Sequence, residues 1–336
     1  MKVAAVMILT TTIFAASGHA DTLLVANKSD DTLDVIDLVS GKSRARLETG
    51  HAPHEIAVSP DGRTAVVTNY GDRATPGSSL TVVDLRASKV VRTIDLGEHR
   101  RPHGVAWLDA NRIAVTAEGS GRLLVVDVRA GTVAAAFETG AEISHMVAVA
   151  GSRAFVANIG SGSVTAIDLD GKKARVAIAT GAGAEGIAVR PRSNEVWVTN
   201  READTLSVID AKTLEVKATV EAKGFPIRIA FTPDGRRAIV SAARSGEVVL
   251  VDAEERREIR RAALDLRNAP DAAQRLFGDR FGASPVPVGI VMAADGKTAF
   301  VAATQSDAVV VIDTSTLEVR DLLKAGREPD GMALAP

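Results

Sequence analysis

Histidines stand at the start of three similar pentapeptides in this sequence. His54 begins HEIAV, His103 begins HGVAW and His145 begins HMVAV. Carboxylates take the same position in two further copies, with Glu185 in EGIAV and Asp330 in DGMAL. An imidazole titrates near pH 6.5, so it can transfer a proton or, when neutral, bind a metal ion. A fold that gathers these five positions would create a site for acid–base, metal or ligand-binding chemistry.

The same position recurs with apolar residues in IRIAF, at Ile227, and in VGIVM, at Val288, which makes seven copies. One complete repeat, residues 184–224, contains four runs rich in Val and Ile that are separated by turn-forming residues. We expect its strands over Gly186–Val189, Glu195–Thr199, Leu206–Ile209 and Val216–Val220. Because one small sheet cannot bury both of its faces, seven such antiparallel units predict an all-β, seven-bladed β-propeller.

The second expected strand of the repeat carries a recognisable signature. It reads LVAN at 24–27, VVTN at 66–69, FVAN at 155–158 and WVTN at 197–200. This signature resembles the YVTN repeat, and the resemblance covers nearly the whole chain after residue 20. It implies the propeller fold. It leaves the function open, because the YVTN family includes many binding proteins and a few enzymes.

The two ends of the chain are complementary parts of one repeat. The segment Leu23–Asn27 matches a second strand, whereas the last residues, from Asp330 onward, match a first strand. We therefore predict that Met332–Leu334 pairs with Leu24–Ala26 and closes the ring, which removes two exposed sheet edges. The expected third strands all end in Asp, and we predict that these carboxylates accept hydrogen bonds from nearby backbone N–H groups.

In a propeller the first strand of each blade lies nearest the central channel, so the seven equivalent residues should surround its mouth. The polar five form one continuous arc, since the closing blade with Asp330 neighbours the His54 blade, and Ile227 and Val288 complete the circle. On this face we expect eight ligand-binding residues: His54, His103, His145, Glu185, Arg228, Asp330, Tyr70 and Arg201. Arg228 suits a carboxylate or phosphate, although an ion pair with an acid of another blade is the alternative.

Two insertions depart from the repeat and emerge on the same face. Residues 70–79 lengthen one hairpin, and residues 264–287 form a long link between blades. We predict a short helix over Asp271–Phe277, after Pro270 and before Gly278. Leu276, Phe277 and Phe281 are expected to cover Ile227 and Val288 as a lid on the apolar side of the mouth; packing outward against the rim is the alternative.

Three functions are compatible with these residues. The first is non-catalytic binding of a small molecule or a protein partner at the channel mouth. The second, implied by relatives that form or open lactones, is a hydrolase or lyase with His103, His145, Glu185 and Arg228 as catalytic candidates. The third is a metal- or redox-cofactor-binding accessory protein, in which His54, His103 and His145 bind a divalent ion such as zinc or copper. The sequence contains no nucleophile elbow, phosphate-binding Gly loop, haem-attachment Cys pair or HExxH motif.

The first 20 residues read as a secretory signal peptide, with Lys2, an apolar run and a small-residue cleavage site after Ala20. We expect a periplasmic or secreted protein with no membrane span after cleavage, and a single propeller domain over residues 21–336. Without residues 1–20 the chain carries 39 Lys and Arg against 42 Asp and Glu, and aromatic residues are 3%. This composition argues against a nucleic-acid partner. Cysteine is absent, so disulfides cannot contribute to stability.

Overall fold

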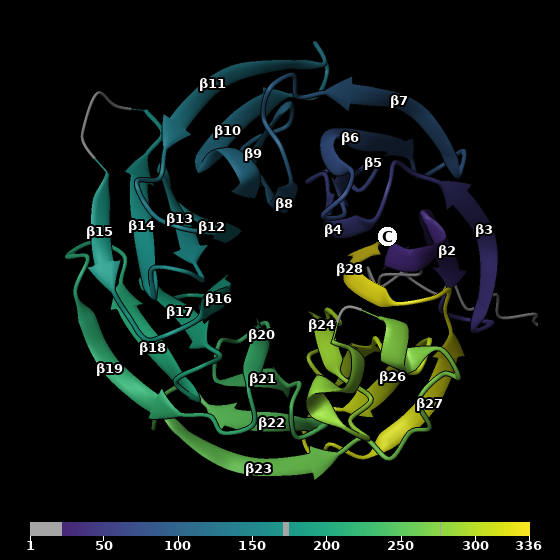
Figure 1. Cartoon of the computed structure of the whole chain (residues 1–336). Coiled ribbons are helices and arrows are strands. Elements are labelled where there is room, and N and C mark those ends of the chain that lie inside the picture. The colour runs from purple at the N-terminus through teal and green to yellow at the C-terminus, as the bar shows by residue number, and fades with distance from the viewer. Residues whose placement is uncertain (1–21, 171–174, 276) are drawn as a thin grey trace, which may run out of the picture.

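Each repeat folds as a four-stranded antiparallel sheet, and seven such sheets surround a central channel (Figure 1). The structure is a computed structural model that describes residues 22–170, 175–275 and 277–336. The predicted signal peptide lies outside the described residues. The second and third strands of each blade are almost completely buried, because their Val, Ile and Leu side chains pack against the neighbouring blades on both faces. The outermost strands alternate between exposed and partly buried residues, as expected for a half-solvated sheet surface.

The blades have equivalent strand order, from the channel outward. The first blade consists of β4 (Pro53–Val58), β5 (Thr64–Gly71), β6 (Pro76–Asp84) and β7 (Lys89–Asp95). The second consists of β8 (Pro102–Trp107), β9 (Arg112–Ala117), β10 (Arg122–Asp127) and β11 (Thr132–Glu138). The third consists of β12 (Ser144–Ala150), β13 (Arg153–Asn158), β14 (Ser163–Asp168) and β15 (Val176–Ala179). The fourth blade consists of β16 (Ala184–Val189), β17 (Glu195–Asn200), β18 (Thr205–Asp210) and β19 (Val216–Glu221). The fifth consists of β20 (Pro226–Phe231), β21 (Arg237–Ala242), β22 (Glu247–Asp252) and β23 (Arg257–Ala263). The sixth consists of β24 (Pro287–Met292), β25 (Thr298–Ala303), β26 (Ala308–Asp313) and β27 (Val319–Lys324).

The closing blade joins the two ends of the described chain, as predicted. Its order is β28 (Pro329–Ala335), β1 (Thr22–Asn27), β2 (Thr32–Asp37) and β3 (Lys42–Glu48). Within it Leu24 lies opposite Ala333, and Val25 lies opposite Met332. The strand expectations for residues 184–224 are confirmed in the same way, since each observed strand contains the expected run.

The third-strand aspartates do what the repeat predicted. Each accepts at least one hydrogen bond from a backbone N–H two or three residues further along the chain, so they belong to the scaffold. The seven residues are Asp37, Asp84, Asp127, Asp168, Asp210, Asp252 and Asp313.

The expected helix over Asp271–Phe277 is wrong. Among its described residues the segment contains one 3₁₀ turn, η3 (Ala272–Gln274), and a second, η4 (Gly278–Phe281), follows it. The helix is interrupted because the backbone of Arg275 is extended and its buried guanidinium binds Asp271, Asp307 and the carbonyl of Thr304. Two further 3₁₀ turns, η1 (Lys28–Asp30) and η2 (Glu118–Ser120), follow second strands at the channel mouth.

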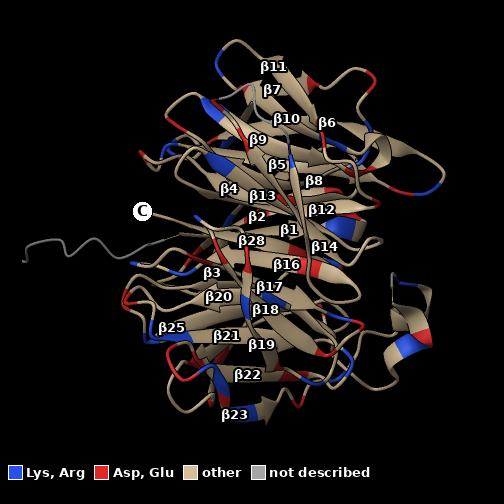
Figure 2. Cartoon of the chain, turned by 90° about the vertical axis from the view of Figure 1, so that its left-hand side faces the viewer, with Lys and Arg blue, Asp and Glu red and all other residues tan. Residues whose placement is uncertain are grey.

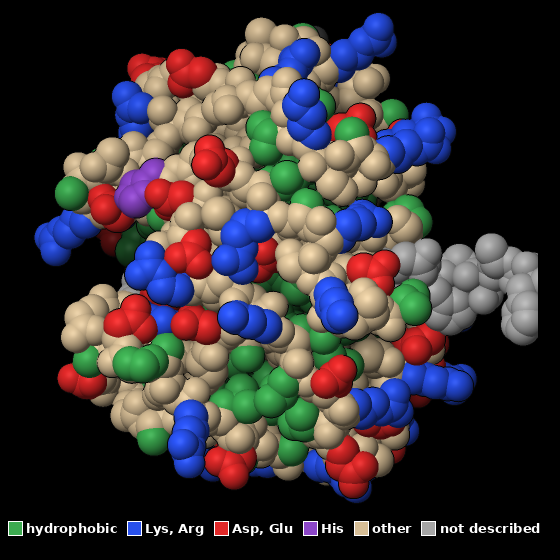
Figure 3. Space-filling view, turned by 90° about the vertical axis from the view of Figure 1, so that its right-hand side faces the viewer, with side chains coloured by type: hydrophobic (Ala, Val, Ile, Leu, Met, Phe, Trp, Pro, Cys, Tyr) green, Lys and Arg blue, Asp and Glu red, His purple; other side chains and the backbone are tan. Residues whose placement is uncertain are grey.

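Basic and acidic side chains are interspersed on the surface, and neither sign dominates the side shown in Figure 2. Over the side with β3 and β27, hydrophobic side chains form separate groups between charged ones (Figure 3). No helix within the described residues is long and apolar enough to cross a membrane.

Candidate functional site

A β-bulge presents a side chain to the channel mouth in every blade. The residue pairing between first and second strands shifts by one residue at this point, for example between Pro53 and Ile56 and between Ala184 and Ile187. Such a bulge bends the strand and redirects the side chains within it. The shift contains the residue that the pentapeptide repeat placed at the mouth, in the same seven places: His54, His103, His145, Glu185, Ile227, Val288 and Asp330.

Backbone strain accompanies the bulge. Two residues before each mouth residue, the chain takes a positive φ in all seven blades, at Ala52, Arg101, Ile143, Gly183, Phe225, Val286 and Glu328. Only one of these is glycine. Left-handed backbone is costly for other residues, and most of all for β-branched Ile143 and Val286. The ring of blades thus holds a strained residue at six of the seven points where the mouth is built.

The hydroxyl of the repeat signature stabilises the bulge. Thr199, from the WVTN copy, accepts a hydrogen bond from the backbone N–H of Gly186 and donates one to the carbonyl of Ile227 in the next blade. Thr116 makes the equivalent contacts with Gly104 and with the carbonyl of His145. Where the second strand carries Thr at this position, as at Thr116 and Thr199, its hydroxyl therefore satisfies a backbone donor that the bulge leaves unpaired and ties adjacent blades together at the mouth.

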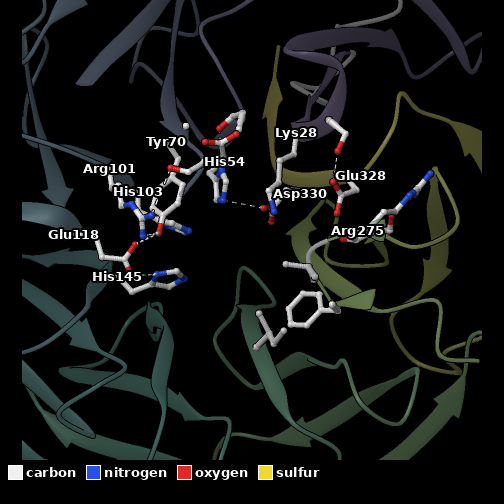
Figure 4. Close-up of a pocket in the computed structure, with 18 of the residues that line it drawn as sticks. Lys28, His54, Tyr70, Arg101, His103, Glu118, His145, Arg275, Glu328 and Asp330 are labelled. Atoms are coloured by element: carbon white, nitrogen blue, oxygen red, sulfur yellow. Dashed lines mark hydrogen bonds and ion pairs between the residues drawn. The ribbon is translucent and has the colours of Figure 1, made fainter. Parts of the chain in front are cut away.

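The bulges surround a cavity of roughly 820 Å³ at the channel mouth (Figure 4). All eight residues that the sequence suggested for ligand binding line it: His54, Tyr70, His103, His145, Glu185, Arg201, Arg228 and Asp330. They come from six different blades, so only the closed ring brings them together. Their role in binding stays a prediction, but their convergence is a property of the fold.

Four aromatic rings form one wall of this cavity. The ring centroids of His54 and Tyr70 are 4.3 Å apart, those of His54 and His103 are 4.9 Å apart, and those of His103 and His145 are 3.6 Å apart. The short last separation, at an interplanar angle of 35°, brings two imidazoles nearly face to face. Tyr70 also donates a hydrogen bond to Glu118, which follows the second strand of the adjacent blade.

A chain of alternating charges crosses the channel beside the cavity. Arg228 donates hydrogen bonds to Glu55 over 2.6 Å and to Glu185 over 3.3 Å. Glu55 lies in β4 and Arg228 in β20, so this buried pair spans the channel. Glu185 also accepts a hydrogen bond from Arg201 over 2.6 Å, and its carboxylate lies 3.5 Å from Nε2 of His145. Of the two expectations for Arg228, the structure shows the ion pair with acids of other blades.

The charged forms of this network are strongly favoured. Burial alone would raise the pKa of Glu185, but His145, Arg201 and Arg228 outweigh it and lower that pKa to about 2. Burial opposes the protonated form of His145, whereas Glu118 and Glu185 on either side of the ring raise its pKa above the usual 6.5. Burial likewise disfavours charged Arg228, but Glu55, Glu185 and Asp330 raise its pKa. These groups hold one another in fixed protonation states.

His54 and His103 are in contrast kept neutral. Burial, together with the positive charge of Lys28, lowers the pKa of His54 well below 6.5, and burial with the nearby charge of His145 does the same for the pKa of His103. Nδ1 of His54 donates to the carbonyl oxygen of Ala52 over 2.9 Å, which leaves Nε2 as an acceptor. Nδ1 of His103 is buried and has no hydrogen-bond partner among the described residues.

Asp330 closes the polar arc beside His54. Its Oδ2 atom lies 3.9 Å from Nε2 of His54, and its buried Oδ1 atom has no hydrogen-bond partner within the described chain. Burial and the neighbouring carboxylate of Glu55 raise the pKa of Asp330 to about 6, although Lys28 and Arg228 act in the opposite direction. Asp330 is therefore the carboxylate of the mouth whose charge changes near neutral pH.

The predicted metal site finds no support in the arrangement of the described residues. They include no group of three or more His, Cys, Asp or Glu side chains that could hold a metal ion. His103 and His145 face each other through their rings, and one nitrogen of His54 is bound to a backbone carbonyl. The zinc or copper hypothesis for His54, His103 and His145 thus rests on the sequence alone.

The opposite side of the mouth is apolar and is covered by the long insertion. Phe281 is buried against Phe225, Ile227 and Val288, and Phe277 packs on the same cluster. The ring centroids of Phe281 and Phe225 are 5.0 Å apart. The prediction that this segment covers Ile227 and Val288 is confirmed for Phe277 and Phe281, whereas Leu276 lies outside the described residues. Phe277, Arg275 and Arg280 also line the cavity.

Three residues of the site were not singled out from the sequence. Glu55 follows His54 in HEIAV just as Arg228 follows Ile227 in IRIAF, so the repeat places both residues next to the mouth position of their blades. Lys28 follows the LVAN signature, and Arg101 occupies the strained position two residues before His103. Both lie at the ends of strands that face the mouth, and each has a neighbour from another blade, which is His54 for Lys28 and Tyr70 for Arg101.

The closed ring of seven four-stranded blades and the second-strand signature show that the chain is a YVTN-type seven-bladed β-propeller. Residues 106–272 match the family model described as YNCE-like beta-propeller. An uncharacterized protein YncE of Salmonella typhi is 26% identical over 236 residues, which cover 66% of this chain. The match spans 65% of that relative, slightly under two thirds of its length.

Solved structures share the fold at low sequence identity. A functionally unknown protein from Desulfotomaculum acetoxidans superposes with a TM-score of 0.76 and 12% identity, over 94% of this chain and 99% of that chain. Hydrazine synthase of Kuenenia stuttgartiensis gives a TM-score of 0.69 and 19% identity, over 89% of this chain and 93% of that chain. At these identities the likeness establishes the fold alone.

Proposed function

We propose that this protein is an exported binding protein that takes a small organic molecule into the cavity at its channel mouth. Two buried polar atoms of the cavity, Nδ1 of His103 and Oδ1 of Asp330, have neither a hydrogen-bond nor an ion-pair partner among the described residues, and this observation carries the proposal. Leaving a buried polar atom unpaired costs about 1–3 kcal/mol, which a bound molecule offsets by supplying the missing donor or acceptor.

The size and composition of the cavity favour a small ligand over a macromolecule. Its volume of roughly 820 Å³ falls in the range of small-molecule sites. It combines an aromatic wall at Tyr70 and the three histidines with an apolar side at Ile227, Val288 and Phe277. A ligand with both polar and apolar parts would match both sides.

Binding without catalysis accounts best for the charged groups. Arg228, Glu185 and His145 are engaged with one another, so the catalytic candidates are already neutralised by protein partners. His54 and His103 are weak bases because their pKa values lie well below 6.5. The hydrolase alternative would have to use Asp330, whose pKa of about 6 suits proton transfer near neutral pH.

A thermal-shift and ligand-observed NMR screen of small metabolites against the purified protein tests the proposal. We expect hits whose binding is lost in His103→Phe, which fills the cavity, and is retained in Arg236→Met, a change in the exposed turn at the opposite end of the blades. A panel that produces no binder, or binders indifferent to His103→Phe, would overturn it. Metal analysis of the same preparation addresses the accessory alternative, which requires a near-stoichiometric ion lost on changing His54, His103 and His145 to Ala.

A further inference from the structure

The acidic and basic side chains that line the cavity differ in how many of them have a direct partner. Every carboxylate that lines it has a hydrogen-bonding or charged neighbour, including Glu118, Glu185 and Glu328. Four of the seven Lys and Arg residues of the lining, Arg201, Arg228, Arg275 and Arg280, form ion pairs. The other three, Lys28, Arg73 and Arg101, form no ion pair within 4 Å of a described carboxylate, although the charges of Lys28 and Arg101 act to lower the pKa values of Asp330 and Glu118.

The three unmatched cations lie on two sides of His54. Lys28 approaches it from the closing blade, beside Asp330, whereas Arg101 approaches from the adjacent blade beside Tyr70 (Figure 4). The guanidinium of Arg101 lies 5.4 Å from the Tyr70 ring centroid and contacts oxygen atoms of Tyr70 and Asp72 at 3.5 Å. Arg73 lies in the extended hairpin loop between β5 and β6, on the same side as Arg101.

Between these cations lies the wall formed by His54, Tyr70, His103 and His145. The rings are not coplanar, because His103 lies at 71° to His54 and at 85° to Tyr70, so the wall presents both ring faces and ring edges. Aromatic groups bind such a surface through offset-stacked or edge-to-face contacts. The two neutral imidazoles add hydrogen-bonding atoms without adding charge. Cations without a direct ion pair at the edges of a wall of aromatic rings form a binding surface for a planar aromatic molecule with negatively charged ends.

We infer that the ligand of this cavity is a planar organic anion, bound with its ring on the His54–Tyr70–His103–His145 wall and its anionic groups toward Lys28 and Arg101. This inference rests on the proposed function and names its ligand class. Partly buried cations interact with an anion more strongly than exposed ones, because water screens them less. The apolar cluster opposite, at Ile227 and Val288, accommodates the body of the molecule.

Three matched probes separate charge from shape. Isophthalate is planar and carries two carboxylates, isophthalamide is planar and neutral, and cyclohexane-1,3-dicarboxylate is charged without being planar. Titration of the purified protein by calorimetry and NMR should show isophthalate binding at least tenfold more tightly than either analogue. Inorganic phosphate, which is charged but has no ring, should compete weakly.

Two variants locate the binding. Lys28→Met and Arg101→Met should each weaken isophthalate binding by roughly tenfold, as loss of a charge-assisted contact predicts, and leave isophthalamide unaffected. Arg236→Met, which removes an exposed cation at the other end of the blades, should change neither. If isophthalate does not bind, or if isophthalamide binds as tightly, the inference fails. The proposed function then still stands if the metabolite screen yields a neutral ligand that His103→Phe excludes.

Discussion

The two sides of the channel mouth have the same backbone and opposite chemistry. In both, a bulge presents the mouth residue and a positive φ lies two residues before it. On the polar side this device displays His54, His103, His145, Glu185 and Asp330, which are joined to a buried ion-pair network. On the apolar side it displays Ile227 and Val288, which are covered by Phe281. The same backbone therefore accommodates either a polar or an apolar mouth residue, and the site arises from substitutions at this one position of the repeat.

The two sides should also differ in how much stability is lost when one of their residues is mutated. A buried ion network depends on every partner, since removal of one leaves a charge without compensation. An apolar cluster loses only the contacts of the residue that is removed. Changes of equal size on the two sides should consequently differ in magnitude and in their dependence on pH.

The largest effect is expected for Arg228→Met. This change removes the cation that both Glu55 and Glu185 contact in a buried site, so we expect the free energy of unfolding to fall by about 3–5 kcal/mol, measured by urea denaturation. Adding Glu55→Gln should recover much of the loss, because it removes the uncompensated charge. An Arg228→Met protein as stable as the parent would show that the ion pair across the channel does not form.

On the apolar side, Phe281→Ala should release the long insertion without unfolding the ring. Arg275 is buried, so trypsin can cleave after it only when the segment opens. Loss of the Phe281 contacts, about 3 kcal/mol for a buried Phe, should raise the cleavage rate after Arg275 by up to roughly a hundredfold. Ile259→Ala, at an exposed site on β23, is the control and should leave cleavage unchanged; equal cleavage in both variants would contradict the packing.

The sequence allowed the ring, its closure and the polar arc to be predicted because each depends on a local pattern that is repeated. Strand runs, bulge residues and the terminal aspartates recur within each repeat, as the four strands of residues 184–224 show. The pairing of Arg228 with Glu55 could not be assigned, because it joins residues 173 positions apart across the channel. The helix expected after Pro270 failed for a similar reason: the long-range contacts of Arg275 with Thr304 and Asp307 override local propensity.

Asp330→Asn tests the pH behaviour of the polar side. The folded pKa of about 6 exceeds the ordinary value of 3.8, so protonation of Asp330 stabilises the fold below pH 4, and this contribution is lost as pH rises through 6. Asn cannot ionise, so the variant should match the parent near pH 4 and exceed it by roughly 1–3 kcal/mol at pH 7, at about 1.4 kcal/mol for each unit of pKa. Thermal denaturation across this range provides the measurement. Parallel stability curves would show that Asp330 does not titrate there.

The smallest effect concerns the strain that both sides share. Ile143 and Val286 occupy equivalent left-handed positions, with φ of 55° and 52°, but Ile143 is 43% exposed and Val286 is 1% exposed. Glycine relieves about 1–2 kcal/mol of left-handed strain at either site and costs about 0.5–1 kcal/mol through the unfolded chain. Ile143→Gly should therefore stabilise the protein by about 0.5–1 kcal/mol, since little burial is lost. Val286→Gly gives up a fully buried side chain, about 1.5–3 kcal/mol, and should destabilise it by about 1 kcal/mol. Chemical denaturation of the two variants measures both. If both variants change the free energy of unfolding in the same direction, the burial of the side chain does not decide the effect of glycine at these left-handed positions.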